Sequence, residues 1–283
     1  MTENNRMKEM PVNRLMGLPM ILSMALQAVY NIVDSAFVGN MREGGEAALN
    51  AMTLAFPVQM LMVALAIGTG VGVNALLART LGQGNREKAA KVAGNGLFLG
   101  AVIYLICLLF GLAGAGAYIA SQTADAQVIG MTHDYLFICC TFSFGVVFFS
   151  LFEKLLQATG RSLYSTIGQI TGAVINIVLD LILIGGFRMG VGAAAFATIA
   201  SQTVSAVLAF SKLIRSKEEW AVRPREVRFD GPSLKAVIVQ GLPYGIQNSV
   251  ISLANVIVQS NINSFGANAM AGCGAYSKVE GFA

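Results

Sequence analysis

Two aspartates lie deep inside long apolar stretches of the sequence, where a charged side chain is costly. Asp180 follows Asn176 at a spacing of four, and Asp34 follows Asn31 at a spacing of three, so each pair shares one face of a helix. An ionised aspartate near the middle of a bilayer costs about 3 kcal/mol on insertion scales and marks a functional site by default. Two carboxylates with amide and hydroxyl oxygens suit a proton or a small hard cation such as Na⁺, and if the two approach closely they cannot both stay ionised without one. The alternative is that each aspartate only caps or bridges helices.

A third apolar stretch adds the hydroxyl of Thr198, with Ser201 and Gln202 close by, to the candidate residues Asp34, Asn176 and Asp180. Other polar residues form stripes along otherwise apolar helices. Such stripes must face a water-filled cavity or each other. The residues that we expect to line a substrate cavity are Gln27, Tyr30, Asn31, Gln202, Asn248 and Asn255.

The sequence carries no motif of an enzyme. The chain has a single histidine and therefore no Ser-His-Asp grouping, and it has neither a P-loop nor an intramembrane metalloprotease motif. We expect no catalytic residues, no cofactor and no metal other than Na⁺ at the candidate cation site. Glu153 and Lys154 are interpreted as an interfacial ion pair, and Gly68, Gly70 and Gly72 as a close helix-packing face.

The composition indicates what kind of fold must position these residues. Of the 283 residues, 55% are apolar and 12% are charged, whereas soluble domains carry about 25% charged residues. This composition excludes a disordered chain, a nucleic-acid binder and an ordinary cytosolic enzyme, and it predicts an all-α polytopic membrane protein. Apolar runs long enough to span a bilayer cover about 15–38, 47–77, 93–120, 128–151, 164–185, 191–213 and 234–261. The chain ends inside an expected eighth span.

Lys and Arg residues are confined almost entirely to alternate connections between these spans. Sixteen of the 19 lie before the first span or in the connections after the second, fourth and sixth spans. By the positive-inside rule, this distribution predicts a cytoplasmic N-terminus. It also supports six spans before the long basic connection, because one missed span would have scrambled the alternation.

The seventh span repeats features of the first. The tripeptide Gly-Leu-Pro at 17–19 recurs at 241–243, and Asn31 recurs as Asn255, both at an offset of 224. Six intervening spans, an even number, make this a parallel repeat. The alternative is that Gly-Leu-Pro is a common helix-start tripeptide. The repeat predicts a parent protein of about 450 residues with twelve spans.

From the repeat follows a predicted domain organisation. We expect an N-terminal six-helix bundle over 1–213, a cytoplasmic linker loop over 214–232, and the truncated start of a second bundle over 233–283. Span 7 and part of span 8 therefore belong to the second bundle.

Segments along the whole chain resemble the multidrug and toxic compound extrusion (MATE) family, most closely its bacterial MepA-like branch. They are Pro-Met-Ile-Leu-Ser at 19–23, Tyr-Asn-Ile-Val-Asp-Ser-Ala-Phe-Val-Gly at 30–39, Ala-Arg-Thr-Leu-Gly-Gln-Gly-Asn at 78–85, Asn-Ile-Val-Leu-Asp at 176–180 and Ala-Ala-Ala-Phe-Ala-Thr at 193–198. The resemblance implies twelve helices in two six-helix bundles around a central cleft. It places the family's cation site on Asp34, Asn176, Asp180 and Thr198, and a helix bend at Pro19. Some relatives carry a Glu in the seventh span, and this sequence has none there.

The expected function is that of a multidrug efflux antiporter in a bacterial inner (plasma) membrane. It would be coupled to H⁺ or Na⁺ and would export cationic lipophilic small molecules by alternating access. The partners are then these molecules and the lipid bilayer, with no nucleic acid, and we expect a monomer at full length. One alternative is a lipid-linked oligosaccharide flippase of the same superfamily, which would favour a strongly cationic cavity. A second is a channel or a structural membrane subunit.

Overall fold

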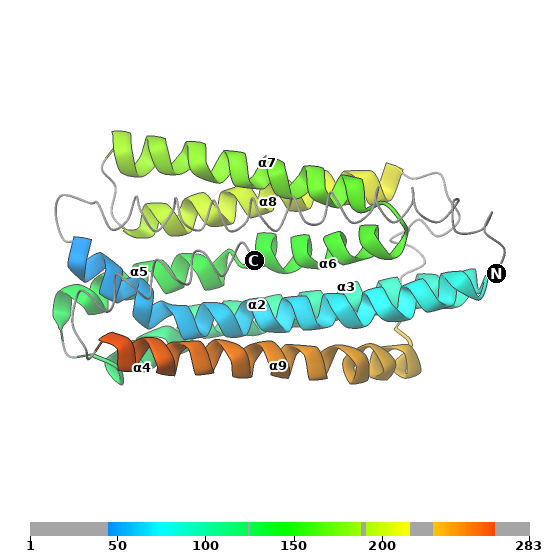
Figure 1. The fold of residues 1–283 in the computed structure, drawn as a ribbon, viewed down its shortest axis with the longest axis horizontal. Helices are drawn as coiled ribbons and strands as arrows, with labels where there is room; N and C mark the ends of the chain where they lie inside the picture. Colours follow the sequence, from blue (N-terminus) through cyan, green and yellow to red (C-terminus); the bar gives the residue numbers. More distant parts are fainter. Residues whose placement is uncertain (1–44, 124, 188–190, 216–228, 264–283) are drawn as a thin grey trace.

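The computed structural model describes residues 45–123, 125–187, 191–215 and 229–263. The helices of this part lie side by side with nearly parallel long axes (Figure 1), and no strand occurs among the described residues. In chain order they are α2 (Gly45–Gly82), α3 (Arg86–Leu109), the π-helical segment η1 (Phe110–Gly114), α4 (Ala115–Ala120), α5 (Ala126–Thr141), α6 (Phe144–Ala158), α7 (Ser162–Asp180), the π-helical segment η2 (Leu181–Gly186), α8 (Val191–Arg215) and α9 (Gly231–Asn263).

Most of the described helices are long and apolar enough to cross a bilayer. Within the described ranges, the helical stretches over 50–82, 86–120, 162–186 and 192–215 meet this requirement. They correspond to the predicted second, third, fifth and sixth spans. The predicted fold class of an all-α polytopic membrane protein is therefore confirmed.

The predicted fourth span, over 128–151, is not one continuous helix. It consists of α5 and α6, whose axes differ by 44°. The break lies at Phe142 and Ser143, and Thr, Phe and Ser have lower intrinsic helix propensity than Ala or Leu. A run of apolar residues alone predicts such a span but does not predict its break.

The predicted seventh span forms the single 33-residue helix α9. It is not among the described helices that are apolar enough to be counted as spans. Gln240, Gln247 and Asn248 interrupt its apolar run. In Figure 1, α9 lies alongside α2 over much of its length.

Several predicted elements lie outside the described residues. The predicted first span is one of them, together with its candidate residues Pro19, Gln27, Tyr30, Asn31 and Asp34. Residues 216–228 of the predicted linker loop and residues 264–283 also lie outside the described part.

Local signals account for two tight turns and two helix starts. Gly84 and Gly160 have φ values of 70° and 75° in the turns after α2 and α6, a backbone conformation that favours glycine. The Asn85 side chain accepts a hydrogen bond from the Lys88 backbone nitrogen at the start of α3. Asp125 caps α5 in the same way, accepting from the nitrogen of Gln127 at 2.8 Å.

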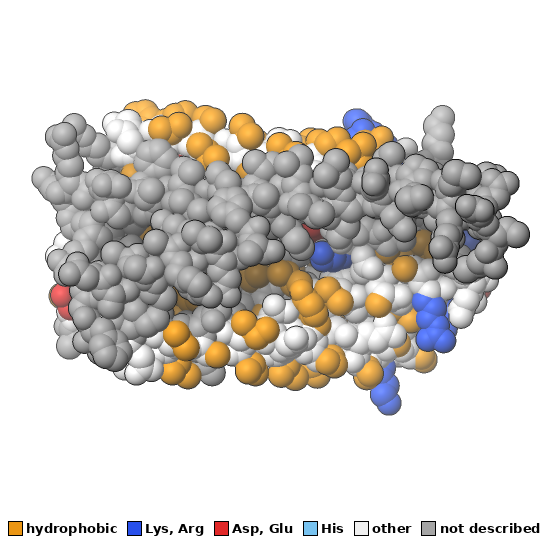
Figure 2. Space-filling view, in the orientation of Figure 1, with side chains coloured by type: hydrophobic (Ala, Val, Ile, Leu, Met, Phe, Trp, Pro, Cys, Tyr) orange, Lys and Arg blue, Asp and Glu red, His pale blue; other side chains and the backbone are white. Residues whose placement is uncertain are grey.

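The Lys and Arg residues of the described helices gather at one end of the bundle. One end is where α2, α6 and α8 finish and α3, α7 and α9 begin, and we call it the basic end. Every Lys and Arg of the described residues lies at or near it: Arg79, Arg86, Lys88, Lys91, Lys154, Arg161, Lys212, Arg215 and Lys235. On the face shown in Figure 2, the blue side chains lie in the half that contains this end.

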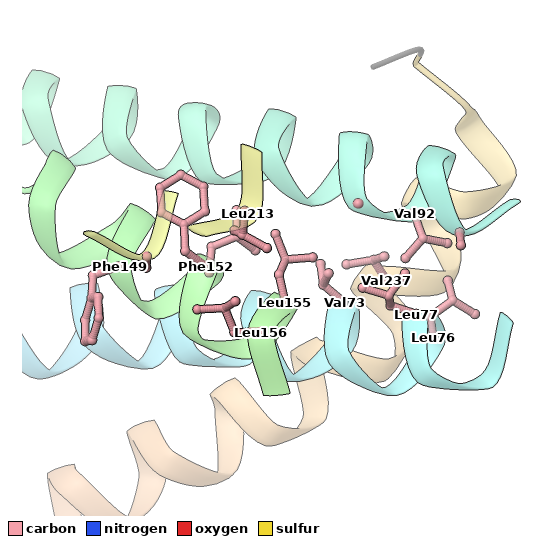
Figure 3. Packing of buried hydrophobic residues seen from close by; sticks show 14 of the residues in the cluster. Val73, Leu76, Leu77, Val92, Phe149, Phe152, Leu155, Leu156, Leu213 and Val237 are labelled. Carbon is pink, nitrogen blue, oxygen red and sulfur yellow. The ribbon is translucent and has the colours of Figure 1, made fainter. Parts of the chain in front are cut away.

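Buried apolar side chains fill the space between the helices in layers. The largest cluster lies near the basic end and joins α2, α3, α6, α8 and α9; it includes Val73, Val92, Leu155, Leu156 and Val237 (Figure 3). A second cluster near the opposite end includes Leu136 and Ile184. Large apolar residues on the outside, such as Leu105 and Leu112, remain exposed, as expected for a surface in contact with lipid.

One glycine sets the distance between α6 and α8. A Cβ atom on Gly145 of α6 would lie 2.5 Å from the Oγ1 atom and 2.8 Å from the backbone nitrogen of Thr203 on α8. Helices in membranes approach this closely only where small residues line the contact. Gly145 therefore fixes how α8, which carries Thr198, lies against α6.

We expect Gly145→Ala to lower stability by about 1–3 kcal/mol, because the added methyl group overpacks a backbone contact. Thermal unfolding in detergent measures the effect as a lower Tm. Gly130→Ala on α5 is the matched control, since a Cβ atom there would meet no heavy atom within 4 Å. It should raise stability by about 0.5–1 kcal/mol through the helix propensity of alanine. An equal Tm for the two variants would contradict the packing role of Gly145.

Candidate functional site

The structure brings three of the predicted cation-site residues together at the interface of α7 and α8. Asn176 and Asp180 lie one turn apart on α7, and both side chains are buried. The Asn176 Nδ2 atom donates a hydrogen bond to the Oγ1 atom of Thr198 on α8, at a distance of 3.5 Å. The spacing of four residues thus places an amide and a carboxylate on the face of α7 that meets α8.

Small residues line the contact between α7 and α8 on the side of this group that faces the basic end. The Ser205 hydroxyl on α8 donates to the backbone carbonyl of Gly168 on α7 at 2.9 Å. A Cβ atom on Gly172 would overlap the same Ser205 hydroxyl. The Ser201 hydroxyl donates to the backbone carbonyl of Thr198 at 2.8 Å. Close packing and hydroxyl hydrogen bonds therefore fix the position of Thr198 relative to Asn176.

The helix changes geometry directly after the buried carboxylate. Asp180 is the last residue of α7, and the next six residues form the π-helical segment η2. π-helical segments inside longer helices occur frequently at functional sites. The backbone before Asp180 is thus a regular α-helix, and the backbone after it forms the wider turns of a π-helix.

The assembled groups can hold a proton or a cation. Asp180 is fully buried one turn from Asn176, and Asn176 in turn contacts the Thr198 hydroxyl. Among the described residues, the Asn176 Oδ1 atom is buried without a hydrogen-bond donor, and a buried carbonyl oxygen in this position calls for a partner. Oxygen atoms of carboxylates, amides and hydroxyls are ligands for hard cations. Asp34, the fourth predicted member, lies outside the described residues.

The predicted cavity residues on α8 and α9 are less closely grouped. Gln202 is half-buried next to Ser201. Asn248 turns back onto its own helix, where its Nδ2 atom donates to the backbone carbonyl of Tyr244 at 3.0 Å. The side chain of Asn255 lies outside the described residues.

Sequence reasoning missed a second buried polar network, formed by α6 and α7. The Gln157 Nε2 atom donates to Glu153 at 2.9 Å, and the Lys154 Nζ atom donates to Gln157 at 3.1 Å. Gln157 also lies 3.4 Å from the Ser165 hydroxyl of α7. The signal for part of this network was the i, i+4 spacing of Glu153 and Gln157.

The network is more buried than an interfacial ion pair. The side chains of Glu153 and Lys154 are only 16% and 20% exposed, with 4.0 Å between the Lys154 Nζ and Glu153 Oε1 atoms. The Lys154 stem packs over Gly70 of α2, whose added Cβ atom would lie 2.9 Å from the Lys154 Cγ atom. The Asn74 side chain of α2 donates to the Lys154 backbone carbonyl at 3.0 Å. The network therefore ties α6 to both α2 and α7.

Residues 19–182 match the model of the MatE family. Multidrug export protein MepA of Staphylococcus aureus is 24% identical over 266 residues, which cover 94% of this chain and 58% of that protein. The chain thus spans less than two thirds of the length of this relative. The match includes Asn176 and Asp180 and ends before Thr198.

Two solved structures show the same arrangement of helices. An outward-facing conformation of a multidrug resistance MATE family transporter has a TM-score of 0.87 and 26% identity, covering 96% of this chain and 60% of the transporter. An inward-facing conformation of such a transporter has a TM-score of 0.77 and 27% identity, covering 88% and 56%.

Proposed function

Because the chain belongs to the MatE family, we propose that it forms the first part of a cation-coupled multidrug efflux antiporter. The proposed protein exports cationic lipophilic compounds by alternating access, as a multi-pass protein of a bacterial plasma membrane and as a monomer at full length. The observation that carries the proposal is the hydrogen bond between Asn176 and Thr198 at the α7–α8 interface, with Asp180 buried one turn from Asn176. The similarity to a multidrug export protein supports the class of substrate.

The proposed coupling step uses the charge of Asp180 together with that of Asp34. A proton or Na⁺ that enters from outside binds these carboxylates, with Asn176 and Thr198 as neutral oxygen donors. Binding changes the local charge and favours one conformation over the other. In this proposal Pro19 provides the bend in the first span. The residues proposed to line the substrate path are Gln27, Tyr30, Asn31, Gln202, Asn248 and Asn255.

The topology of the proposal follows from the basic end. Excess Lys and Arg mark the cytoplasmic side of membrane proteins, so we infer that the basic end and the N-terminus face the cytoplasm. Residues 1–213 then form the first bundle, 214–232 a cytoplasmic linker and 233–283 the start of the second bundle. Substrate enters from the cytoplasm or the inner leaflet and leaves on the opposite side.

The charge distribution disfavours the two alternative functions. A flippase for lipid-linked oligosaccharides needs cations within the membrane to hold phosphate groups, and the described Lys and Arg residues gather toward one end. A channel has no need for a buried carboxylate with an amide and a hydroxyl beside it.

Efflux of a fluorescent lipophilic cation such as ethidium from cells expressing the full-length transporter tests the proposal. Cells should keep ethidium out while the ion gradients are intact and should accumulate it once ionophores collapse both the H⁺ and the Na⁺ gradient. Ionophores selective for each ion identify the coupling ion. Efflux that persists after both gradients are collapsed would contradict an antiporter, and passive flux in both directions would indicate a channel.

A further inference from the structure

Four glycines form a backbone-to-backbone crossing between α2 and α9. A Cβ atom on Gly72 would overlap the carbonyl oxygen of Val237 and lie 2.9 Å from the nitrogen of Gly241. A Cβ atom on Gly241 would overlap the carbonyl oxygen of Gly68, and one on Gly68 would lie 3.0 Å from the Cα atom of Gly245. The spacing of four residues on both helices puts these glycines on the facing sides. We call this contact the glycine crossing.

The crossing lies at the same depth on both helices. Gly72 precedes the last residue of α2 by ten positions, and Gly241 follows the first residue of α9 by ten positions. At a rise of about 1.5 Å per residue, each lies about 15 Å from the basic end of its helix. The contact is therefore well inside the membrane on the basic side.

One side chain of α9 anchors the crossing in the first bundle. Val237 is fully buried and belongs to the apolar cluster that α2, α3, α6 and α8 share. Figure 3 shows it pointing toward Val73 and Leu77 of α2. Ala236 packs against the same cluster and is partly buried, so Val237 is the one fully buried apolar side chain that the described part of α9 contributes.

A polar contact near the basic end joins the start of α9 to α3. The Asp230 backbone nitrogen donates to the Asn95 Oδ1 atom on α3 at 3.3 Å, and the Ser233 backbone nitrogen donates to the Asp230 carboxylate at 3.0 Å. Hydrogen bonds from the Ser233 hydroxyl and backbone lower the pKa of Asp230, and the charges of Lys91 and Lys88 lower it further. Because the pKa falls on folding, this cap is complete at neutral pH and is lost only as the pH drops through the lowered value.

A cavity of about 340 Å³ lies next to the glycine crossing, on the side of the basic end. It lies between α2, α3 and the start of α9 and is lined by Leu76, Lys88, Lys91, Asp230 and Ala236, among others. Leu76 is one turn from Gly72, and Ala236 adjoins Val237. The cavity therefore lies between the basic end and the glycine crossing.

We infer that the glycine crossing is the cytoplasmic gate of the transporter. It seals the space between the first bundle and α9 in the outward-facing state and parts in the inward-facing state. The inference rests on the proposed function, in which α9 starts the second bundle and the basic end is cytoplasmic.

The chemistry of the crossing suits a contact that must open and close in each cycle. Glycines lose no side-chain freedom when two helices meet, and small residues allow close van der Waals contact in lipid. A crossing of long interdigitating side chains would bury more surface and would be harder to open. A methyl group on either helix should therefore hold the gate open.

Distance measurements between spin labels test the gate directly. Labels attached through Gln83→Cys and Lys235→Cys, both exposed positions at the basic end, flank the crossing in the full-length transporter without its native cysteines. The closed gate should give a short distance, and substrate or altered pH should populate a second, longer one. Gly72→Ala and Gly241→Ala should shift the population to the longer distance even without substrate, and efflux should fall at least tenfold.

Two glycines provide matched controls on α2. Gly70→Ala overpacks Lys154 of α6 within the first bundle, so it should lower the Tm without shifting the distance. Gly82→Ala meets no atom within 4 Å and should change neither. Wild-type transporter that exports drug but keeps one label-to-label distance under all conditions would contradict the assignment of the glycine crossing as the gate. Equal distances in Gly72→Ala and Gly70→Ala would contradict it as well. If wild type exports nothing, the proposed function fails instead.

Discussion

Asp180→Asn is expected to abolish drug efflux by the full-length transporter while its amount in the membrane stays near that of wild type. The substitution keeps the shape of the side chain and removes its negative charge. A neutral amide cannot change its charge when a proton or Na⁺ binds, so the proposed coupling step is lost. Because Asp180 is fully buried, removing its charge also removes a desolvation cost, and folding should not suffer. Efflux of ethidium should fall at least about tenfold, toward the level of cells without the transporter.

Asp134→Asn is the matched control for this prediction. Asp134 lies on α5 beside His133, and its side chain is 78% exposed, so the same chemical change there should leave efflux unchanged. Asn176→Leu should reproduce much of the Asp180→Asn defect, since it removes the amide that bonds Thr198. Normal efflux by Asp180→Asn at normal expression would overturn the role of the carboxylate.

Lys154→Met is expected to destabilise the protein by about 3 kcal/mol, because it leaves the Glu153 carboxylate in a largely buried site without its cation. The Glu153 and Lys154 side chains are only 16% and 20% exposed. Replacing both with neutral residues, as Glu153→Gln with Lys154→Met, should cost much less than the single change, since no uncompensated charge remains. Thermal unfolding of the purified protein in detergent measures these differences as shifts in Tm.

The double variant is what distinguishes a coupled pair from two independent residues. Coupling requires that the double variant be more stable than the sum of the two single changes implies. Gln157→Leu should also lower the Tm, because Gln157 bonds Glu153 and Lys154. Additive effects of Glu153→Gln and Lys154→Met would show that the pair contributes no mutual stabilisation.

The residues whose chemistry was evident from the sequence are those whose position depends on one helix alone. Asn176 and Asp180 share a helix face at a spacing of four, and the structure buries both side chains, with Asn176 hydrogen-bonded to Thr198 of α8. Long apolar runs predicted the second, third, fifth and sixth spans, which the structure confirms as helices. Hydropathy is a property of the local sequence, so these features needed no knowledge of packing.

The features that sequence reasoning missed arise from contacts between helices. The predicted fourth span bends by 44° at Phe142 and Ser143, and its continuous apolar run did not indicate this break. Glu153 and Lys154 were expected at the membrane interface, and the packing of α2 and α7 buries them. Gly68, Gly70 and Gly72 were correctly assigned to helix packing, but the sequence did not indicate that Gly68 and Gly72 face α9 while Gly70 faces α6.

Ion-driven transport by purified full-length protein in liposomes tests the central proposal most directly. An imposed H⁺ or Na⁺ gradient should drive accumulation of ethidium against its own gradient in wild type, and accumulation should be absent from Asp34→Asn and Asp180→Asn. Asp134→Asn should transport as wild type does. Accumulation of equal size in wild type and Asp180→Asn, or wild-type transport that needs neither gradient, would contradict a cation-coupled antiporter centred on these two carboxylates.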